Sequence, residues 1–199
     1  MKSRFLTSAE LERLRLACNF DHWLPFEVAL NTGLRIGDIL NLRSQNIGCG
    51  VITFTAQKTG KRGSVACPRE LCDTLRARVG DRLGALIFPS PANPLLPLTR
   101  QAAWSRVKRA AKRCGVDPAG VSPHSLRKTF AVHLYQREGL TAVQTALQHA
   151  RVSTTEIYAL SDWLSGENSS KPLTRADIPY VIERVYDALK CRIDISTDL

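Results

Sequence analysis

The sequence contains no long apolar run, and its first residues, MKSRFLTSAELERL, include no hydrophobic stretch of the length that a secretory signal requires. These absences argue against a membrane-embedded chain and against a cleaved leader. Internal repeats and low-complexity tracts are also missing, and a content of 44% hydrophobic and 23% charged residues is ordinary for a globular protein. With 199 residues, the chain can form one large domain or two small ones around a core that needs no disulfide.

Cysteine is present but not in any pattern that binds zinc. There is no C-x-x-C pair, and no cysteine stands beside a histidine in the sequence. Zinc sites and disulfide frameworks both need such spacing, so we expect neither, and we expect reduced thiols in a cytoplasmic protein. The six cysteines are Cys18, Cys49, Cys67, Cys72, Cys114 and Cys191.

What the chain does have is an excess of positive charge. It contains 28 Lys plus Arg against 18 Asp plus Glu, a formal net charge of +10. A field of this sign attracts polyanions, with nucleic acid as the first candidate and an acidic membrane surface as the second. The basic residues are spread along the chain, which favours nucleic acid over a membrane.

The order of the expected elements is that of an α+β protein that is mainly helical. A capping-box pattern at Thr7 and Glu10 opens the first helix. The β-branched segments 51–55 and 64–67 predict antiparallel strands joined by the basic turn KTGKRG. Further helices are expected over 23–31, 36–42, 69–78 and 100–113, from Ser122-Pro123 onward, from Thr141 to near His149, over 154–161, and after Thr174.

Two of these helices carry polar groups suited to binding an anion. Ser122 is an N-cap and Pro123 the first helical residue, so His124 and Arg127 share one face and can converge on one anion. The helix expected over 100–113 is rich in basic residues, which fit a DNA-facing surface and a solvated surface equally well. These residues are Arg106, Lys108, Arg109, Lys112 and Arg113.

Attack on a phosphodiester without a metal needs cations on the non-bridging oxygens, a nucleophile, and a proton donor for the leaving oxygen. Arg35 and Arg127 suit the first role, because a guanidinium grips two oxygens and stays charged. His124 and His149 can donate further hydrogen bonds or accept the proton of the nucleophile. Tyr158 supplies an oxygen that can form a covalent phosphotyrosine.

The proton donor is expected on the basic hairpin turn. Lys58 stands at the start of this turn and is the first choice, with Lys61 as the fallback. Taken alone, Arg35 would be a surface or capping residue and Tyr158 a core aromatic. Because all the parts occur together, in order and with close local spacing, phosphoryl transfer on DNA is the leading interpretation.

These motifs resemble the catalytic domain of the tyrosine recombinases, the phage-integrase family. The resemblance covers essentially residues 6–158. It is most specific where H-x-x-R and the later histidine-to-tyrosine spacing occur together. The matching segments are TGLRIGDIL around Arg35, KTGK at Lys58, PHSLRKTFA at His124 and Arg127, and LQHARVSTTEIY with His149 and Tyr158.

The resemblance implies a mixed, mainly helical fold with a small three-stranded antiparallel sheet, and no metal or nucleotide cofactor. It also implies that Tyr158 attacks one DNA strand, forms a 3′-phosphotyrosyl bond and frees a 5′-hydroxyl, which then attacks a partner strand through a Holliday junction. Lys58 would protonate the leaving oxygen, and Asp38 would support the arginine without touching DNA. The implied phosphate cradle consists of Arg35, His124, Arg127 and His149.

The expected partners follow from the same resemblance. They are double-stranded DNA with specific recombination sites, further copies of the chain forming a tetramer on that DNA, and an accessory DNA-bending protein, with no membrane partner. The basic residues expected to contact DNA are Lys61, Arg62, Arg106, Arg109, Arg113 and Lys128.

The chain departs from the family pattern in two ways. Gln148 stands where the family usually has a glycine before the histidine, and we expect no separate N-terminal core-binding domain in this chain. The chain therefore resembles short single-domain members such as fimbrial phase-variation invertases, although a piece of a longer integrase would look the same. We expect one catalytic domain over 1–199, with a core over 1–165. The loop and helix over 166–199 dock on a neighbouring protomer or pack on their own domain.

The leading function is thus a site-specific DNA recombinase, with integration, excision and inversion all open. The alternative is a DNA-binding regulator that keeps the fold and has lost strand transfer. A general basic nucleic-acid-binding protein would explain the net charge of +10 but not the set of motifs.

Overall fold

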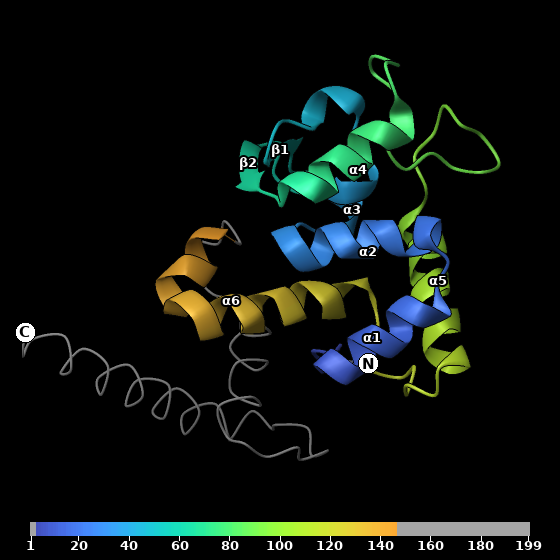
Figure 1. The fold of residues 1–199 in the computed structure, drawn as a ribbon, viewed down its shortest axis with the longest axis vertical. Helices are drawn as coiled ribbons and strands as arrows, with labels where there is room; N and C mark the ends of the chain where they lie inside the picture. The colour runs from blue at the N-terminus through green and yellow to red at the C-terminus, as the bar shows by residue number, and fades with distance from the viewer. Residues whose placement is uncertain (1–2, 147–199) are drawn as a thin grey trace, which may run out of the picture. The chain divides into compact units, whose positions relative to one another are not determined.

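The computed structural model describes residues 3–146 (Figure 1). The chain divides into two units, residues 1–148 and 149–199, so all the described residues belong to the first unit. Outside the described residues lie the predicted His149 and Tyr158 and the helices expected over 154–161 and after Thr174.

Helices make up most of the described residues, as the sequence predicts, and the helices expected over 69–78 and 100–113 are found within one residue of those bounds. None of the described helices combines the length and the apolar character needed to cross a membrane. The elements in chain order are α1 (Ser8–Ala17), α2 (Phe20–Thr32), α3 (Ile36–Leu40), the 3₁₀ helix η1 (Ser44–Asn46), β1 (Val51–Thr55), β2 (Arg62–Ala66), α4 (Arg69–Val79), α5 (Arg100–Arg113) and α6 (Pro123–Ala146).

Side-chain caps decide where the first two helices begin. Thr7 and Glu10 form the predicted capping box at the start of α1. Helix α2 begins three residues earlier than expected, because Asn19 Oδ1 accepts from the amide of His22 at 2.9 Å and so caps the helix. Gly33 ends α2 with φ of 65°, the left-handed conformation that glycine adopts without strain. The chain thereby reverses directly before Arg35.

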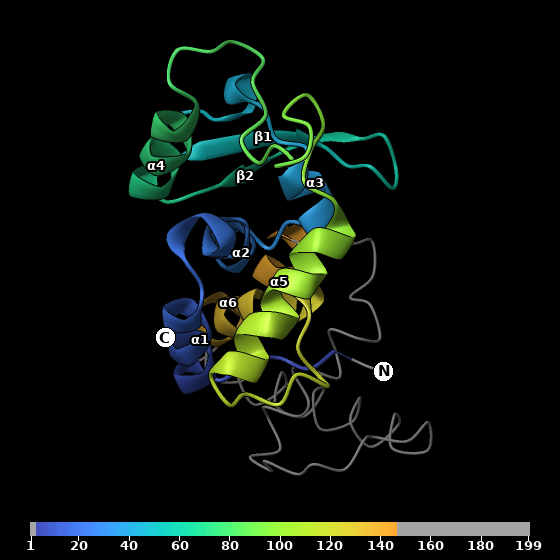
Figure 2. The same cartoon turned by 90° about the vertical axis from the view of Figure 1, so that its right-hand side faces the viewer.

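Helix α2 lies between the hairpin region and α6 (Figure 1). It packs along α6 and against α3, while α5 packs against α1 and, at its other end, against α3 (Figure 2). The space between these helices is filled by fully buried apolar side chains such as Phe26, Ile39 and Leu126. Burial of this apolar surface is the main source of stability for such a fold.

The sheet is an antiparallel pair, β1 and β2, in a register that runs from Val51 opposite Ala66 to Thr55 opposite Arg62. Alternate residues of β1, Ile52 and Phe54, are buried, and α4 packs against this strand. Three strands were expected. Within the described residues there are two, extended beside β1 by an isolated bridge between Ile47 and Ile52.

Helix α6 starts at Pro123, as predicted, but it is longer than expected. The sequence predicts a new helix capped by Thr141, whereas α6 continues through this residue to Ala146. Between Pro123 and Thr141 the residue with the lowest helix propensity is Gly139, which costs about 1 kcal/mol relative to alanine and does not by itself end a helix. Threonine is compatible with a helix interior as well as with a cap, so the separate helix expected from Thr141 was wrong.

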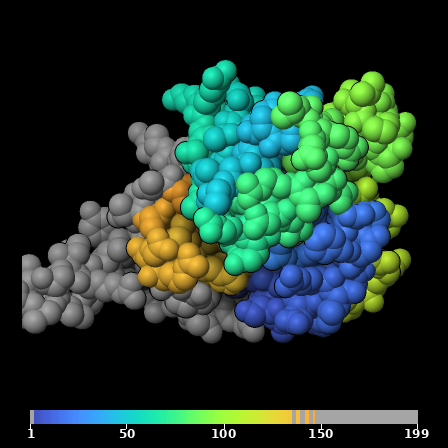
Figure 3. All heavy atoms as spheres, turned by 45° about the horizontal axis from the view of Figure 1, so that its top comes forward, coloured from blue at the N-terminus to red at the C-terminus, as the bar shows by residue number. Residues whose placement is uncertain are grey.

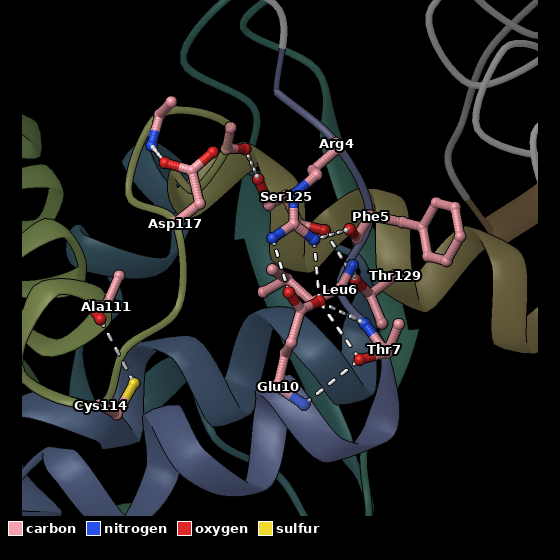
Figure 4. A network of polar contacts seen from close by, with 12 residues as sticks. Arg4, Phe5, Leu6, Thr7, Glu10, Ala111, Cys114, Asp117, Ser125 and Thr129 are labelled. Carbon is pink, nitrogen blue, oxygen red and sulfur yellow. Dashed lines mark hydrogen bonds and ion pairs between the residues drawn. The ribbon is translucent and has the colours of Figure 1, made fainter. Parts of the chain in front are cut away.

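A segment without regular secondary structure, residues 3–7, lies along the start of α6 (Figure 4), and we call it the N-terminal strap. The amide of the buried Leu6 donates to Thr129 Oγ1 at 2.9 Å. Lys128 Nζ donates to the carbonyl of Ser3, and the amide of Arg4 donates to the carbonyl of Gly120 at 3.1 Å. The strap thus joins the N-terminus to residues more than a hundred positions later in the chain.

Arg4 and Glu10 fasten the strap to α1. The guanidinium donates to both carboxylate oxygens, with Nη2 to Oε1 at 2.6 Å and Nη1 to Oε2 at 2.8 Å, and the amide of Thr7 donates to Oε2 at 3.0 Å (Figure 4). The hydrogen bond from Arg4 is the largest cause that lowers the pKa of Glu10 from 4.5 to about 2.

The lowered pKa of Glu10 predicts how the stability of the protein changes at acid pH. Because the folded pKa of Glu10 lies below the unfolded value, its carboxylate contributes stability above about pH 4.5, and this is lost as the pH falls toward 2. We expect Glu10→Gln to remove about 1–2 kcal/mol at pH 7, after allowing for solvent screening at the half-exposed Arg4, and much less at pH 3. Urea denaturation at both pH values measures this difference. Glu12→Gln, at an exposed position of α1, is the control and should follow wild type. An equal loss for Glu10→Gln at both pH values would contradict the assignment.

Candidate active site

Arg127, in the second turn of α6, is one of the two buried charged residues of the candidate site. Its side chain is 4% exposed, and Nη1 donates to the carbonyl of Gly33, the residue that ends α2. A buried cation is tolerated only where hydrogen bonds replace its hydration, so this contact fixes the guanidinium in place. Since Gly33 lies two residues before Arg35, the bond joins α6 to the segment that carries Arg35.

His124 lies in the first turn of α6, three residues before Arg127. Its side chain is exposed, whereas that of Arg127 is buried. Residues three apart share a helix face, and on this face His124 is the exposed residue and Arg127 the buried one; their convergence on one anion stays a prediction.

Arg35 stands at the N-cap of α3, with its side chain half-buried. Its carbonyl accepts from the amides of Asp38 and Ile39 at 2.9 and 3.0 Å, which begins the helix. The backbone at Arg35 is therefore held from both sides, by α3 after it and by the Gly33–Arg127 bond before it. This arrangement places the two predicted arginines of the phosphate cradle in adjoining parts of the fold.

Asp38 connects α3 to the hairpin. The residue is 4% exposed, and Oδ1 accepts from the amide of Gln57 at 2.9 Å. The family resemblance assigns Asp38 to support of the arginine, but the hydrogen bond that the structure gives it goes to the residue directly before Lys58. One short helix thus carries Arg35 at its start and anchors the hairpin turn through Asp38.

Gly37 allows this close approach of α3 to the hairpin. A Cβ at this position would lie 2.9 Å from Gln57 Oε1 and 3.3 Å from Arg100 Cδ. Arg100, the first residue of α5, is therefore a further cation beside α3 that was not among the residues predicted from the sequence. The Thr99-Arg100 helix start is the signal that could have drawn attention to it.

The hairpin turn itself is exposed and basic, as predicted. Lys58, Lys61 and Arg62 all have exposed side chains. In Figure 2 the turn between β1 and β2 extends past α3, and in Figure 3 the hairpin stands out from the surface of the molecule. Gly60, with φ of 68°, forms the tight part of the turn. Lys58 is thus on a projecting turn whose base is held by Asp38.

Three basic residues of α5 do not join this site. Burial, followed by the charges of Arg106 and Arg109, lowers the pKa of His22, and Arg113 contributes in the same direction. These arginines therefore lie near the start of α2, about 18 Å along that helix from Gly33 at its end. They remain predicted DNA contacts, at the end of α2 opposite to Gly33.

Lys128 differs from its predicted place on a DNA-binding surface. Its side chain is 5% exposed, and Nζ donates to the carbonyl of Ser3 in the N-terminal strap. Sequence alone does not distinguish it from an exposed lysine, because the strap that covers it comes from the other end of the chain. In this structure Lys128 holds the strap rather than facing solvent.

The five cysteines among the described residues are free thiols. Burial is the first cause that raises the pKa of Cys67 to about 12, with its neighbour Cys72 adding to the effect. Within the described part of the chain, no group of three or more His, Cys, Asp or Glu side chains is arranged to hold a metal ion. The described part of the candidate site contains arginine and lysine side chains, the imidazole of His124 and one buried carboxylate, that of Asp38.

Comparison with known proteins identifies the class of protein to which this fold and candidate site belong. Residues 4–163 match the phage integrase family, and the chain belongs to this family. It is 35% identical over 168 residues to "Tyrosine recombinase XerD" of Ralstonia nicotianae, a match that covers 77% of this chain and 54% of the relative. It is 51% identical over 149 residues to XerD of Xanthomonas campestris pv. campestris, covering 67% and 46%.

Solved structures show the same fold. A crystal structure of XerA recombinase matches with a TM-score of 0.65 and 21% identity, over 92% of this chain and 64% of that one. The catalytic domain of bacteriophage HP1 integrase matches with a TM-score of 0.62 and 25% identity, over 87% of this chain and all of that one. The fold is thus that of a tyrosine recombinase catalytic domain. The chain spans about half the length of the XerD relatives it matches.

The role of the hydrogen bond between Asp38 and the hairpin can be tested in the protein without DNA. Asp38→Ala removes the acceptor of the Gln57 amide, so we expect this amide to exchange its hydrogen faster and the protein to lose about 1–3 kcal/mol of stability. Hydrogen exchange followed by NMR, together with urea denaturation, measures both effects. Asp73→Ala, which removes an exposed carboxylate on α4, is the control. Unchanged exchange at Gln57 would show that Asp38 does not hold the hairpin.

Proposed function

We propose that this chain is the catalytic domain of a site-specific DNA recombinase that cleaves and rejoins strands through a 3′-phosphotyrosyl intermediate. The observation that carries the proposal is the bond from the buried Arg127 to the carbonyl of Gly33, because it joins H-x-x-R on α6 to the loop that presents Arg35. The shared fold and family membership support the same reaction class.

Arg35 and Arg127 bind the non-bridging oxygens of the scissile phosphate in this proposal. Two guanidiniums can neutralise the charge that repels a nucleophile and can stabilise the additional charge of the transition state. His124, an exposed residue three positions before Arg127, donates a further hydrogen bond in the proposal. His149 completes the cradle in the proposal, on the basis of its sequence motif.

Tyr158 is the proposed nucleophile. Its hydroxyl oxygen attacks the phosphorus, the bond from phosphorus to the 5′-oxygen breaks, and a 3′-phosphotyrosyl bond forms. The tyrosine proton passes to a histidine of the cradle, and Lys58 Nζ gives a proton to the leaving 5′-oxygen. Attack by the 5′-hydroxyl of a partner strand reverses these steps, so no external energy source is needed.

The proposed partner is double-stranded DNA in the cytoplasm, bound by four copies of the recombinase. Known structures with this fold include a lambda integrase dimer bound to a COC′ core site and a lambda integrase tetramer bound to a Holliday junction. The net charge of +10 and the exposed hairpin cations suit such a partner. An accessory DNA-bending protein, and a choice among integration, excision and inversion, are further parts of the proposal.

The direct test captures covalent complexes in cells that express the protein or its Tyr158→Phe variant. Cells are denatured rapidly, DNA that remains attached to protein is isolated, and the attached ends are sequenced. We expect ends enriched at one or a few sites with wild type and none with the variant, because only the tyrosine can form the bond. Covalent DNA from neither form, with sequence-specific binding retained, would instead identify a DNA-binding regulator.

The role of Lys58 can be separated from that of the cradle by changing the leaving group. With Lys58→Ala, we expect cleavage of ordinary DNA to slow by on the order of 10²–10⁴-fold, the usual contribution of a general acid. A substrate with sulfur in place of the 5′-bridging oxygen needs no proton on its leaving group and should be cleaved at close to the wild-type rate. An equal loss of cleavage rate on both substrates would exclude Lys58 as the general acid. The Lys61→Ala variant tests the alternative residue in the same way.

A further inference from the structure

We propose that the N-terminal strap, acting through Thr129 and Lys128, positions His124 and Arg127 for phosphoryl transfer. The inference rests on the proposed function, because it assigns positioning residues to the same site. None of the strap residues lies in the predicted phosphate cradle. Their effect would be exerted through the first two turns of α6, which carry both members of the H-x-x-R motif.

The strap contacts α6 through buried groups. Thr129 Oγ1 accepts from the amide of Leu6 at 2.9 Å and donates to the carbonyl of Ser125, one turn earlier, also at 2.9 Å. Thr129 is fully buried and Leu6 is 1% exposed, so water cannot replace these bonds. Lys128 Nζ donates to the carbonyl of Ser3, which adds a charged donor beside the neutral pair. Two consecutive residues of α6 are thus fixed to the strap.

The strap also fixes the turn that leads into α6. The amide of Arg4 donates to the carbonyl of Gly120 at 3.1 Å, and Ser125 Oγ donates to the same carbonyl at 3.0 Å. A Cβ at Gly120 would lie 3.0 Å from Arg4 Cγ, so the arginine stem packs directly on this glycine. The amide of Ser122 in turn donates to Ser125 Oγ at 3.1 Å. One polar network therefore connects the strap to the N-terminus of α6 (Figure 4).

Helical geometry carries this constraint to the candidate site. Successive residues of an α-helix are rotated by about 100°, so Lys128 lies one turn after His124 on its side, whereas Thr129 is rotated by about 200° from Arg127 and faces nearly the opposite side. The strap and the Gly33 carbonyl therefore hold this part of α6 through different side chains. Rotation or translation of the helix start would move the imidazole and the guanidinium together.

A positioning role predicts an effect on the rate of cleavage rather than on DNA binding. Affinity for DNA is spread over many phosphate contacts, whereas a displacement of about 1 Å at the reacting phosphate can cost on the order of 10²-fold in rate. A purely structural role predicts only a lower melting temperature.

The test uses Thr129→Val, which keeps the shape of the side chain and removes the hydroxyl. Thr74→Val is the matched control, since Thr74 Oγ1 also donates to the carbonyl one turn earlier, that of Glu70, but on α4 and away from the strap. Thr129→Ser restores the hydroxyl and serves as the rescue. Single-turnover cleavage is measured at saturating protein on a duplex that contains the site recovered by covalent capture. DNA affinity and thermal midpoint are measured in parallel.

We expect Thr129→Val to cleave about ten- to a hundred-fold more slowly than wild type, with DNA affinity changed by no more than about two-fold. Thr129→Ser should recover most of the rate, and Thr74→Val should cleave at the wild-type rate. Cleavage by Thr129→Val at the wild-type rate would overturn the inference and leave the proposed function intact. A rate loss shared with Thr74→Val would also overturn it, because that loss would follow general stability.

A second readout does not depend on cleavage and therefore separates this inference from the proposed function. The ring resonances of His124 and the Nε–H resonance of Arg127 can be followed by NMR in the protein without DNA. We expect Thr129→Val to shift both sets of resonances, and Thr74→Val to leave them in place. Unchanged resonances in Thr129→Val would show that the strap does not position these residues. Failure of the proposed function would instead appear as the absence of covalent DNA with the wild-type protein.

Discussion

The candidate site depends first on the hydrogen bond from the buried guanidinium of Arg127 to the carbonyl of Gly33. A charge that is 4% exposed is stable only where hydrogen bonds replace its hydration, so α6 and the end of α2 cannot separate without exposing or orphaning it. The acceptor belongs to the left-handed residue that ends α2 and turns the chain toward Arg35. One contact between residues 94 positions apart therefore joins the helix that carries Arg127 to the segment that leads into Arg35.

Two further hydrogen bonds to buried side chains position the rest of the site. Asp38 holds the hairpin turn that carries Lys58, and Thr129 holds the strap against α6. Each joins a buried side chain to a backbone amide, an arrangement in which loss of one partner leaves a buried group unsatisfied. The exposed ion pairs of α4, such as Arg76 with Asp73, lack this property and contribute little to stability. The site is thus positioned by buried polar contacts rather than by surface charge pairs.

Local signals in the sequence predicted the elements that hold the site. The capping box at Thr7, the Ser122-Pro123 helix start and the β-branched hairpin strands all depend on neighbours within a few residues, and all are found. Contacts between distant segments could not be read in this way. The burial of Lys128 under the strap and the hydrogen bond of Asp38 to the hairpin depend on segments 125 and 19 residues away. The separation of the α5 arginines from Arg35 likewise follows from packing, not from spacing along the chain.

The central claim is that Arg35 and Arg127 act on one phosphate. A double-mutant cycle tests it most directly, through single-turnover cleavage rates of wild type, Arg35→Ala, Arg127→Ala and the double variant on the captured site. If both guanidiniums bind the same phosphate, the double variant should lose little more than the worse single variant, because residues that act as a unit are strongly non-additive. If the double variant instead loses the product of the two single losses, the arginines act independently and the account of a shared cradle is wrong.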